Sequence, residues 1–226
     1  MKFTLATEAY NTQVMDWPQA GRHIMAQYDD LSIVVYKAFN PDIAEAAVAD
    51  GFFAQAPGYK LERMTWIKPG FLWMMHRSGW ATKPGQERVL AIWLDRVGFD
   101  AILCKAIPST YDSRVYRDAD QWQQAVASSS VRFQWDPDYA PDDTQLSRRA
   151  LQIGLRGKVA RHYVHGGWIL NIEDITDYVH EQRAFARQPF MGLQTPVERV
   201  YPLYDADLEI HFGVGQRPTT PPSSDC

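Results

Sequence analysis

The sequence predicts a single α+β domain, with a mixed sheet flanked by helices. Its 226 residues suit one domain with a full-sized core. Strand-like and helix-like segments follow one another irregularly, which favours α+β over a regular series of βαβ units. The composition is 46% hydrophobic and 22% charged, which is typical of a globular domain. We therefore expect residues 1–212 to form one globular domain and residues 213–226 to be a disordered tail.

Residues 31–51 carry the clearest local pattern. The segment LSIVVYKAF, at residues 31–39, is rich in β-branched and aromatic side chains, which predicts a buried strand. Asn40 is a good N-cap and Pro41 fits the first helical position, so a helix is expected to begin there. Its small apolar residues recur at helical spacing until Gly51, which suits the C′ position. The sequence therefore predicts a strand, a capped helix and a terminating glycine.

Weaker signals place the remaining elements. Pro18 suits the first turn of a short helix over residues 18–28. Residues 136–144 are rich in proline and acidic side chains, which predicts an exposed loop. Periodicity and turn signals predict strands at residues 88–94, 131–135, 150–155 and 168–172, and helices at residues 71–77, 120–127, 158–164 and 174–187.

The segment RMTWIKPGFLWMMHRSGWA, at residues 63–81, has the most unusual composition. It contains three tryptophans, three methionines and four basic residues in nineteen positions. Arg and Lys are rarely buried unless they are paired, and guanidinium groups beside aromatic faces favour a flat, charged ligand. The alternative is an amphipathic helix whose Arg and Lys side chains reach out to water. The residues alone leave both interpretations open.

Three further side chains are candidates for a site. Tyr36 ends a strand just before a helix N-terminus, where anionic ligands often bind, although a core tyrosine is equally compatible. Glu87 could orient a ribose hydroxyl or act as a base, or it could pair with Arg88 on the surface. Gln152 lies in an apolar strand and needs a buried partner or a cleft. Strand alternation places Lys37 opposite Tyr36, and no neighbouring residue in the sequence activates it as a nucleophile.

Other function classes lack their patterns. The net charge of −4 gives no overall attraction to nucleic acid. The chain has no GxGxxG, P-loop, HExxH or GxSxG motif. His162 and His165 are three residues apart, but no carboxylate or cysteine pattern accompanies them, so we predict no metal site. No apolar run approaches membrane length, so we expect a cytoplasmic protein without a membrane partner.

Three segments carry a resemblance to a known family. VVYKAFNPDIAEAAVADG, RMTWIKPGFLWMMHRSGWATKPGQERVLAI and RALQIGLRG together resemble domain-of-unknown-function family 4291, whose core is W-I-K-P-x-F-x-W-M-x-x-R-S-G-W. The resemblance covers roughly Gln19 to Thr176, and the central motif is very specific. The family label implies no activity.

A second resemblance implies a fold and a cofactor. VYKAFNPDIAEAAVADGF is similar in layout to the opening of ADP-ribosyltransferase folds, which implies a split mixed sheet and a cleft that holds NAD. On this resemblance Tyr36 matches the aromatic or basic site residue at the end of the first strand. Gln152 matches the late acidic or amide position, with Glu87 as its substitute. The chain shows neither a clear R-S-E nor a clear H-Y-E triad.

Three functional hypotheses follow. The first is an ADP-ribosyltransferase-like enzyme that binds NAD, transfers to a nucleic-acid or protein acceptor, and uses Tyr36, Gln152 and Glu87 in catalysis. Its expected cofactor-binding residues are Arg63, Thr65, Trp66, Lys68, Arg77, Ser78 and Trp80. The second is a module for RNA or single-stranded nucleic acid, in which the three tryptophans stack on bases. The third is a non-catalytic relative that binds a small nucleotide or a protein partner.

Overall fold

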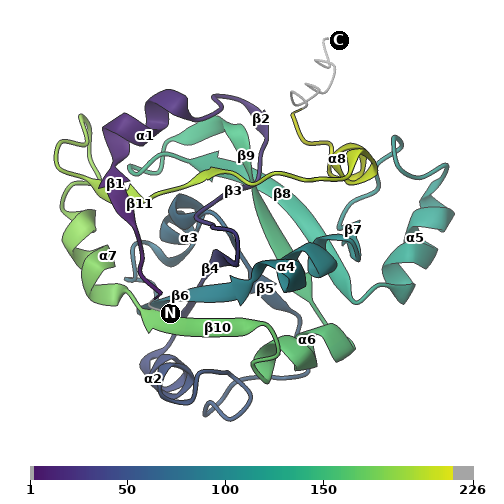
Figure 1. Ribbon diagram of the computed structural model, residues 1–226, viewed down its shortest axis with the longest axis horizontal. Helices are drawn as coiled ribbons and strands as arrows, with labels where there is room; N and C mark the ends of the chain where they lie inside the picture. The colour runs from purple at the N-terminus through teal and green to yellow at the C-terminus, as the bar shows by residue number, and fades with distance from the viewer. Residues whose placement is uncertain (1–2, 216–226) are drawn as a thin grey trace, which may run out of the picture.

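The computed structural model describes residues 3–215 and contains a curled mixed sheet surrounded by helices (Figure 1). Its strands are β1 (Thr7–Ala9), β2 (Gly21–Arg22), β3 (Met25–Ala26), β4 (Ser32–Phe39), β5 (Thr65–Ile67), β6 (Arg88–Asp95), β7 (Ala106–Pro108), β8 (Val131–Tyr139), β9 (Gln145–Leu155), β10 (Ile169–Asp174), β11 (Gln194–Pro196) and β12 (Arg199–Val200). Its helices are α1 (Tyr10–Asp16), α2 (Pro41–Asp50), α3 (Phe71–Ser78), α4 (Arg96–Leu103), α5 (Ala119–Ser128), α6 (Gly157–Val164), α7 (Thr176–Arg183) and α8 (Ala206–Phe212). The predicted single domain of mixed α and β structure is confirmed.

Two groups of strands meet at the centre of the molecule (Figure 1). One group has the order β10-β6-β4, and the other has the order β2-β9-β8-β7 with β5 also paired to β9. The β2–β9 and β7–β8 pairs are parallel, whereas the other pairs in these two groups are antiparallel. A bridge joins the groups, because the backbone N–H of Tyr36 donates to the carbonyl of Lys68 at 2.7 Å. The end of β4 therefore lies beside the residue that follows β5.

Strands β4 and β6 are buried on both faces, as their continuous apolar runs predict. Ile33 and Val35 of β4 belong to the larger hydrophobic cluster, which includes residues of α4, α6, β8 and β9. Val34 and Tyr36 point the other way, into a second cluster with residues of α3 and α7. Because side chains alternate along a strand, Lys37 follows Val35 on the side of the larger cluster.

The unit at residues 31–51 forms as the sequence predicts. The side chain of Asn40 accepts a hydrogen bond from the backbone of Ile43 at 3.0 Å, and Pro41 occupies the first turn of α2. Gly51 ends the helix with a φ of 76°, a left-handed conformation that glycine adopts without a steric penalty. Local capping chemistry is sufficient to define this unit.

Two predicted elements are wrong. Residues 18–28 were expected to be helical, but they form β2 and β3, which pair with β9 and β12. Residues 136–144 were expected to be an exposed loop, but β8 continues to Tyr139. Asp138 in this extension is buried, and its carboxylate forms an ion pair with Arg148 of β9 at 2.7 Å. In both places the conformation depends on pairing with residues outside the segment, which the local sequence pattern does not show.

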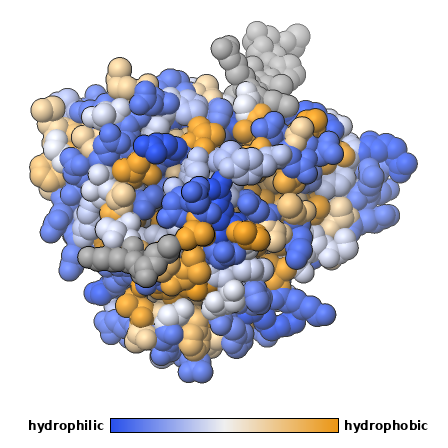
Figure 2. Space-filling model, in the orientation of Figure 1, coloured by the Kyte–Doolittle hydropathy of each residue, from blue (hydrophilic) through white to orange (hydrophobic). Residues whose placement is uncertain are grey.

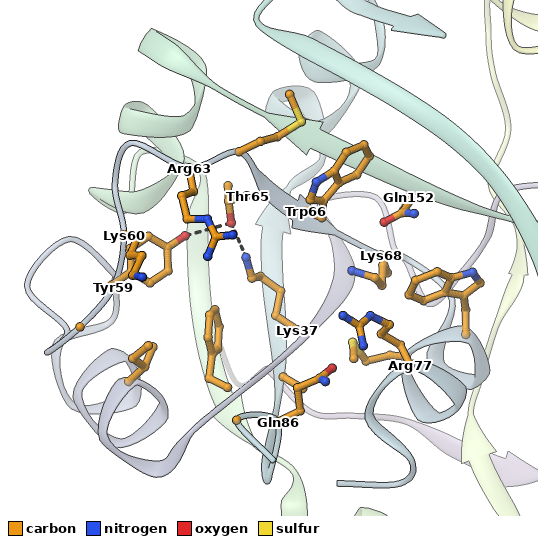
Figure 3. A pocket seen from close by; sticks show the side chains of 18 of the residues that line it. Lys37, Tyr59, Lys60, Arg63, Thr65, Trp66, Lys68, Arg77, Gln86 and Gln152 are labelled. Atoms are coloured by element: carbon orange, nitrogen blue, oxygen red, sulfur yellow. Dashed lines mark hydrogen bonds between the residues drawn. The ribbon is translucent and has the colours of Figure 1, made fainter. Parts of the chain in front are cut away.

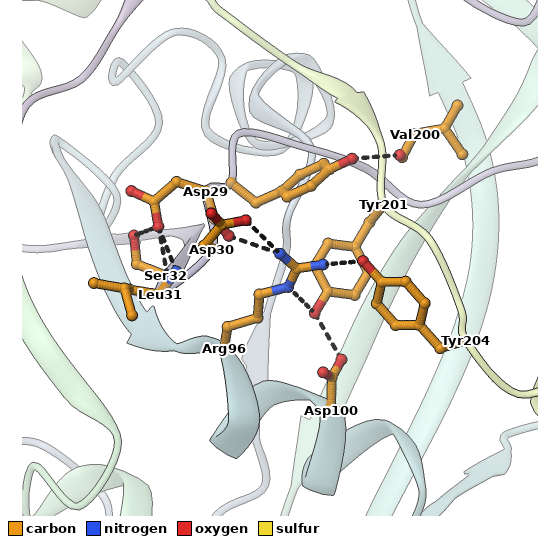
Figure 4. A network of polar contacts seen from close by, with 10 residues as sticks. Asp29, Asp30, Leu31, Ser32, Arg96, Asp100, Val200, Tyr201 and Tyr204 are labelled. Atoms are coloured by element: carbon orange, nitrogen blue, oxygen red, sulfur yellow. Dashed lines mark hydrogen bonds and ion pairs between the residues drawn. The ribbon is translucent and has the colours of Figure 1, made fainter.

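The segment after β12 is fixed to the body of the protein by Arg96, at the start of α4 (Figure 4). Its guanidinium donates to the carbonyl of Asp29 at 2.9 Å and to the hydroxyls of Tyr201 and Tyr204 at 3.2 and 2.7 Å. The Tyr201 hydroxyl in turn donates to Asp100 at 2.6 Å. This network ties the C-terminal segment to α4 and to the turn before β4.

On the face that Figure 2 shows, hydrophobic residues lie in groups among hydrophilic ones. No helix within residues 3–215 is both long enough and apolar enough to cross a membrane. The tail predicted for residues 213–226 lies outside the described residues, apart from its first three positions.

Candidate functional site

A cleft of about 790 Å³ opens where the end of β4 meets β5 and α3 (Figure 3). Residues 58–60 and 63–65 form one wall, and the turn at residues 84–86 forms part of its rim. Gln134 of β8 and Gln152 of β9 contribute amide groups from the other strand group. The junction between the two strand groups is therefore the place where the sheet leaves an open concave surface.

The cleft is strongly basic. Its cationic side chains are Lys37, Lys60, Arg63, Lys68 and Arg77. Its aromatic side chains are Phe39, Tyr59, Trp66 and Trp73. None of the described residues that line it is acidic, although the chain as a whole carries a net charge of −4. Positive charge is therefore concentrated here, which favours an anionic ligand.

Lys37 lies at the inner end of the cleft and is only 8% exposed. Its amine donates a hydrogen bond to the hydroxyl of Thr65, which also accepts one from Tyr59 at 2.9 Å. The amine lies 4.9 Å from the ring centre of Phe39. Burial, and secondarily the positive charge of Lys68, lower the pKa of Lys37 to about 7. A substantial fraction of this amine is therefore unprotonated near neutral pH.

Lys68 is the second buried cation, with 7% exposure. Its amine lies 4.9 Å from the ring centre of Trp73, an arrangement that stabilises a positive charge. Burial lowers the pKa of Lys68 to about 8, with Arg77 contributing in the same direction and Asp136 opposing it. Asp136 makes no ion pair with Lys68, so the charge of this lysine is not neutralised by direct contact within residues 3–215.

Asp136 instead holds the two glutamine side chains of the cleft. Gln134 and Gln152 lie opposite each other on β8 and β9, and each donates its amide to a different oxygen of Asp136 at 2.6 Å. Burial raises the pKa of this carboxyl despite the two hydrogen bonds. Because both amides are directed to Asp136, the carbonyl oxygens of the glutamines are the groups that remain to accept hydrogen bonds from a ligand.

Trp66 owes its position to a glycine on the neighbouring strand. It pairs with Gly154 in the β5–β9 ladder. A Cβ atom at Gly154 would lie 3.0 Å from the indole of Trp66 and 2.6 Å from the sulfur of Met64, so the methionine would have to move and the indole contact would be unusually tight. The indole therefore packs close to the backbone of β9 at Gly154, where the absence of a side chain leaves room for it.

Arg63 and Arg77 complete the charge of the cleft from opposite sides (Figure 3). Neither makes an ion pair with any residue in the described part of the chain. Arg77 lies in the last turn of α3, which ends at Gly79 with a φ of 60°. The other end of α3, its N-terminus, is held in place by a hydrogen bond. The backbone N–H of Phe71 donates to the buried carboxyl of Glu198 at 2.6 Å.

Comparison with known proteins gives a family but no activity. The model of a domain of unknown function, DUF4291, matches residues 23–201. The chain belongs to the DUF4291 family. This region includes every residue named above in the cleft, and no curated protein matches the chain.

The structure brings together most of the site residues predicted from the sequence. Those that line the cleft are Arg63, Thr65, Trp66, Lys68, Arg77 and Gln152. Ser78 and Trp80 lie outside it: Ser78 is fully buried and donates to the carbonyl of Met74, and Trp80 packs in the second hydrophobic cluster. Segment 63–81 therefore alternates between lining the cleft and packing in the core.

Tyr36 and Glu87 also lie outside the cleft. Tyr36 is fully buried against Phe71, with ring centres 5.5 Å apart, and no hydrogen-bond partner for its hydroxyl lies within the described residues. Tyr36 and Gln152 therefore do not face each other across the cleft, because strand alternation turns Tyr36 away and presents Lys37 instead. Glu87 accepts a hydrogen bond from the backbone of Gly85 and lies behind the rim, and Arg88 pairs with Asp174 rather than with Glu87.

Sequence reasoning missed several residues of the cleft. They are Lys37, Tyr59, Lys60, Gln86 and Gln134. Lys37 could have been found, because a lysine inside an apolar strand needs either a partner or a ligand. Tyr59 and Lys60 belong to a loop whose sequence carries no such signal. No group of three or more His, Cys, Asp or Glu side chains within residues 3–215 is arranged to hold a metal ion.

Proposed function

We propose that the cleft binds a phosphorylated nucleotide. The observation that carries this proposal is the concentration of five cationic side chains, two of them less than 10% exposed, in a cleft whose described lining has no acidic residue. Buried cations without a carboxylate partner lower stability, so such an arrangement is expected where a ligand supplies the negative charge. A volume of about 790 Å³ accommodates a molecule of nucleotide size.

Each part of a nucleotide has a matching group in the cleft. Lys37 and Lys68 offer point charges to phosphate oxygens, whereas the guanidinium groups of Arg63 and Arg77 are suited to two-pronged contacts with phosphates. Trp66 and Trp73 provide aromatic faces for a base or a nicotinamide ring. The carbonyl oxygen of Gln152 is placed to accept a hydrogen bond from a ribose hydroxyl or a base amino group.

NAD is one member of this ligand class, since it carries two phosphates and two aromatic groups. The proposal therefore includes NAD binding by an ADP-ribosyltransferase-like fold, as the sequence resemblance implies. Transfer of ADP-ribose proceeds through a cationic oxocarbenium-like state. The cationic lining weighs against stabilising such a state, whereas it favours the binding of phosphates. We therefore propose nucleotide binding as the function and treat ADP-ribosyl transfer as one activity to be assayed.

Single-stranded nucleic acid is a weaker candidate for the ligand. Of the three tryptophans of segment 63–81, Trp66 and Trp73 line the cleft, but Trp80 is 5% exposed and packs in the core. The two buried lysines lie deep in a concave site, which suits a compact ligand better than an extended strand that needs successive stacking platforms.

A thermal-shift panel tests the proposal. The purified full chain is heated with ATP, ADP-ribose, NAD, adenosine or a short single-stranded RNA. ATP, NAD and ADP-ribose should stabilise the protein, by about 2.7 kcal/mol at 100 times the dissociation constant, whereas adenosine should give much less. Lys68→Met should abolish the stabilisation, and Lys158→Met, at an exposed position on α6, should retain it. Equal effects of adenosine and ATP would contradict the proposal, and nicotinamide release from NAD together with an ADP-ribosylated product would identify ADP-ribosyl transfer.

A further inference from the structure

We infer that Lys37 is a nucleophile that accepts a nucleoside monophosphate from the nucleotide held in the cleft, forming a covalent lysine–nucleotide intermediate. This inference rests on the proposed function of the same cleft and goes beyond it, since binding alone needs no reactive group. The donor is a nucleoside 5′-phosphate whose α-phosphorus carries a second phosphate-linked group, as in a nucleoside triphosphate or in NAD.

The placement of Lys37 is the first argument. Its side chain comes from the rigid strand β4, whose neighbouring residues Val35 and Tyr36 are fully buried. The hydroxyl of Thr65 fixes the amine, and Tyr59 fixes Thr65 through a second hydrogen bond. An unprotonated amine that donates one N–H to Thr65 keeps its lone pair for an electrophile. Figure 3 shows this amine between Arg63 on one side and Lys68 with Arg77 on the other.

The protonation state of Lys37 is compatible with attack. A nucleophilic lysine must lose a proton before it can react, and burial or a neighbouring cation provides the usual means. Both are present, since burial and Lys68 lower the pKa of Lys37 to about 7. Lys37 therefore both lies in the cleft and has a lowered pKa that favours its reactive, unprotonated form.

The reaction balances without an oxidant or a reductant. The lone pair of the Lys37 amine attacks the α-phosphorus of a nucleoside triphosphate and forms an N–P bond. The bond from the α-phosphorus to the bridging oxygen breaks, and pyrophosphate leaves with the electron pair. The amine nitrogen loses one proton to solvent. With NAD as donor the same bond forms at the adenylyl phosphorus, and nicotinamide mononucleotide leaves.

The other cations of the cleft favour transfer of a nucleotide to Lys37 over formation of a Schiff base by Lys37. Transfer of a phosphoryl group places negative charge on the α-phosphate oxygens and on the leaving group, which Lys68, Arg63 and Arg77 would stabilise without proton transfer. A Schiff base with a carbonyl compound requires an acid to remove water from the carbinolamine. The described lining of the cleft contains no carboxyl group for that role, and Asp136, which is not part of the lining, accepts hydrogen bonds from both glutamines.

Intact mass spectrometry of the full chain tests the inference. The protein is incubated with Mg²⁺ and each of the four nucleoside triphosphates, and in a separate arm with NAD. We expect one added nucleoside monophosphate per chain, mapped to Lys37 by fragmentation, with an equal amount of pyrophosphate or nicotinamide mononucleotide released. The adduct should survive alkali and be lost in mild acid, as a phosphoramidate is, and added pyrophosphate should reverse its formation from a triphosphate.

Two variants separate chemistry from folding and binding. Lys37→Arg keeps the positive charge and should still be stabilised by nucleotide, but it should form no adduct. Lys158→Arg, on the exposed part of α6, should form the adduct as the wild type does. Nucleotide binding by the wild type without an adduct from any donor would overturn this inference and leave the proposed function intact. An adduct at another residue, or one retained in Lys37→Arg, would also overturn it, and absence of binding would overturn both.

Discussion

Lys68 and Arg148 are two cations with similar burial and different surroundings. Lys68 is 7% exposed and lies 4.9 Å from the ring centre of Trp73, and Arg148 is 3% exposed and lies 5.0 Å from that of Trp17. The difference is a carboxylate: Arg148 binds Asp138 at 2.7 Å, whereas Lys68 makes no ion pair within the described residues. Arg148 also donates to the backbone carbonyl of Pro18 at 3.0 Å.

This comparison distinguishes a buried cation that the fold itself neutralises, Arg148, from one for which we propose an anionic ligand, Lys68. A buried cation with a carboxylate and a carbonyl partner has its hydrogen-bonding capacity used by the fold. A buried lysine beside a second lysine, with a lowered pKa, raises the free energy of the folded state instead. Removing Arg148 should therefore destabilise the protein, whereas removing a cleft lysine should stabilise it and abolish binding.

The largest expected effect is that of Arg148→Ala. It leaves the carboxylate of Asp138 buried without its partner, and breaking such a pair typically costs about 3–5 kcal/mol. Arg117→Ala is the matched control, because Arg117 also binds an aspartate at 2.7 Å but is 84% exposed. Urea unfolding should show a large loss for the first variant and no measurable change for the second. Similar losses in both would mean that burial does not distinguish the two pairs.

Lys37→Met should change stability in the opposite direction. The folded state lowers the pKa of Lys37 from its usual 10.5 to about 7, so the wild type gains stability as pH rises between these values. The variant lacks this penalty and should be more stable than the wild type below pH 7, by on the order of a few kcal/mol. The difference should shrink toward pH 10.5. Unfolding curves at pH 6 and pH 10 measure it, and a variant less stable at pH 6 would show that the cleft lysine supports the fold.

Glu198→Gln tests the same reasoning on a buried acid near Arg148. Burial raises the pKa of Glu198 from 4.5 to about 8, although the hydrogen bond from Phe71 opposes this shift. The folded protein then binds more protons than the unfolded chain between these pH values, so stability falls as pH rises through this range. At pH 9 the variant should be more stable than the wild type by on the order of a few kcal/mol, and near pH 5 the two should differ much less. Parallel pH profiles would contradict a buried, protonated Glu198.

The smallest change in stability is expected for Arg77→Ala. Arg77 is exposed and makes no ion pair within residues 3–215, so the free energy of unfolding should change by less than about 0.5 kcal/mol. Nucleotide binding should weaken by about 1.5–3 kcal/mol, the usual contribution of a charge-assisted hydrogen bond. Titration calorimetry with ATP measures this loss. A variant that unfolds, or one that binds normally, would remove Arg77 from the site.

Local chemistry made part of the fold predictable. The strand at residues 31–39 and helix α2 were found because apolar periodicity, Asn40, Pro41 and Gly51 all act within a few residues of one another. The extension of β8 to Tyr139 was not found, because Arg148 on β9 compensates the buried charge of Asp138 from ten positions away. Helix signals at residues 18–28 gave the wrong result, since pairing with β9 and β12 decides their conformation.

The sequence predicted which segment lines the candidate site, but not which side chains of strand β4 face it. Segment 63–81 was recognised because cations among tryptophans are unusual in a core, and five of its predicted residues line the cleft. Tyr36 was expected to line the cleft, but Lys37 does so instead, because neighbouring residues along a strand point to opposite faces. The loop residues Tyr59 and Lys60 reach the cleft only through the folded path of the chain.

Proton uptake on nucleotide binding tests the central claim most directly. If Lys68 holds phosphate, the negative ligand raises its pKa above the value of about 8 in the empty cleft. Titration calorimetry with ADP at pH 8.5, in two buffers of different ionisation enthalpy, should show protons taken up by the wild type and none by Lys68→Met. Adenosine should cause no uptake. ADP binding without proton uptake, or with uptake that Lys68→Met retains, would contradict phosphate binding by this lysine.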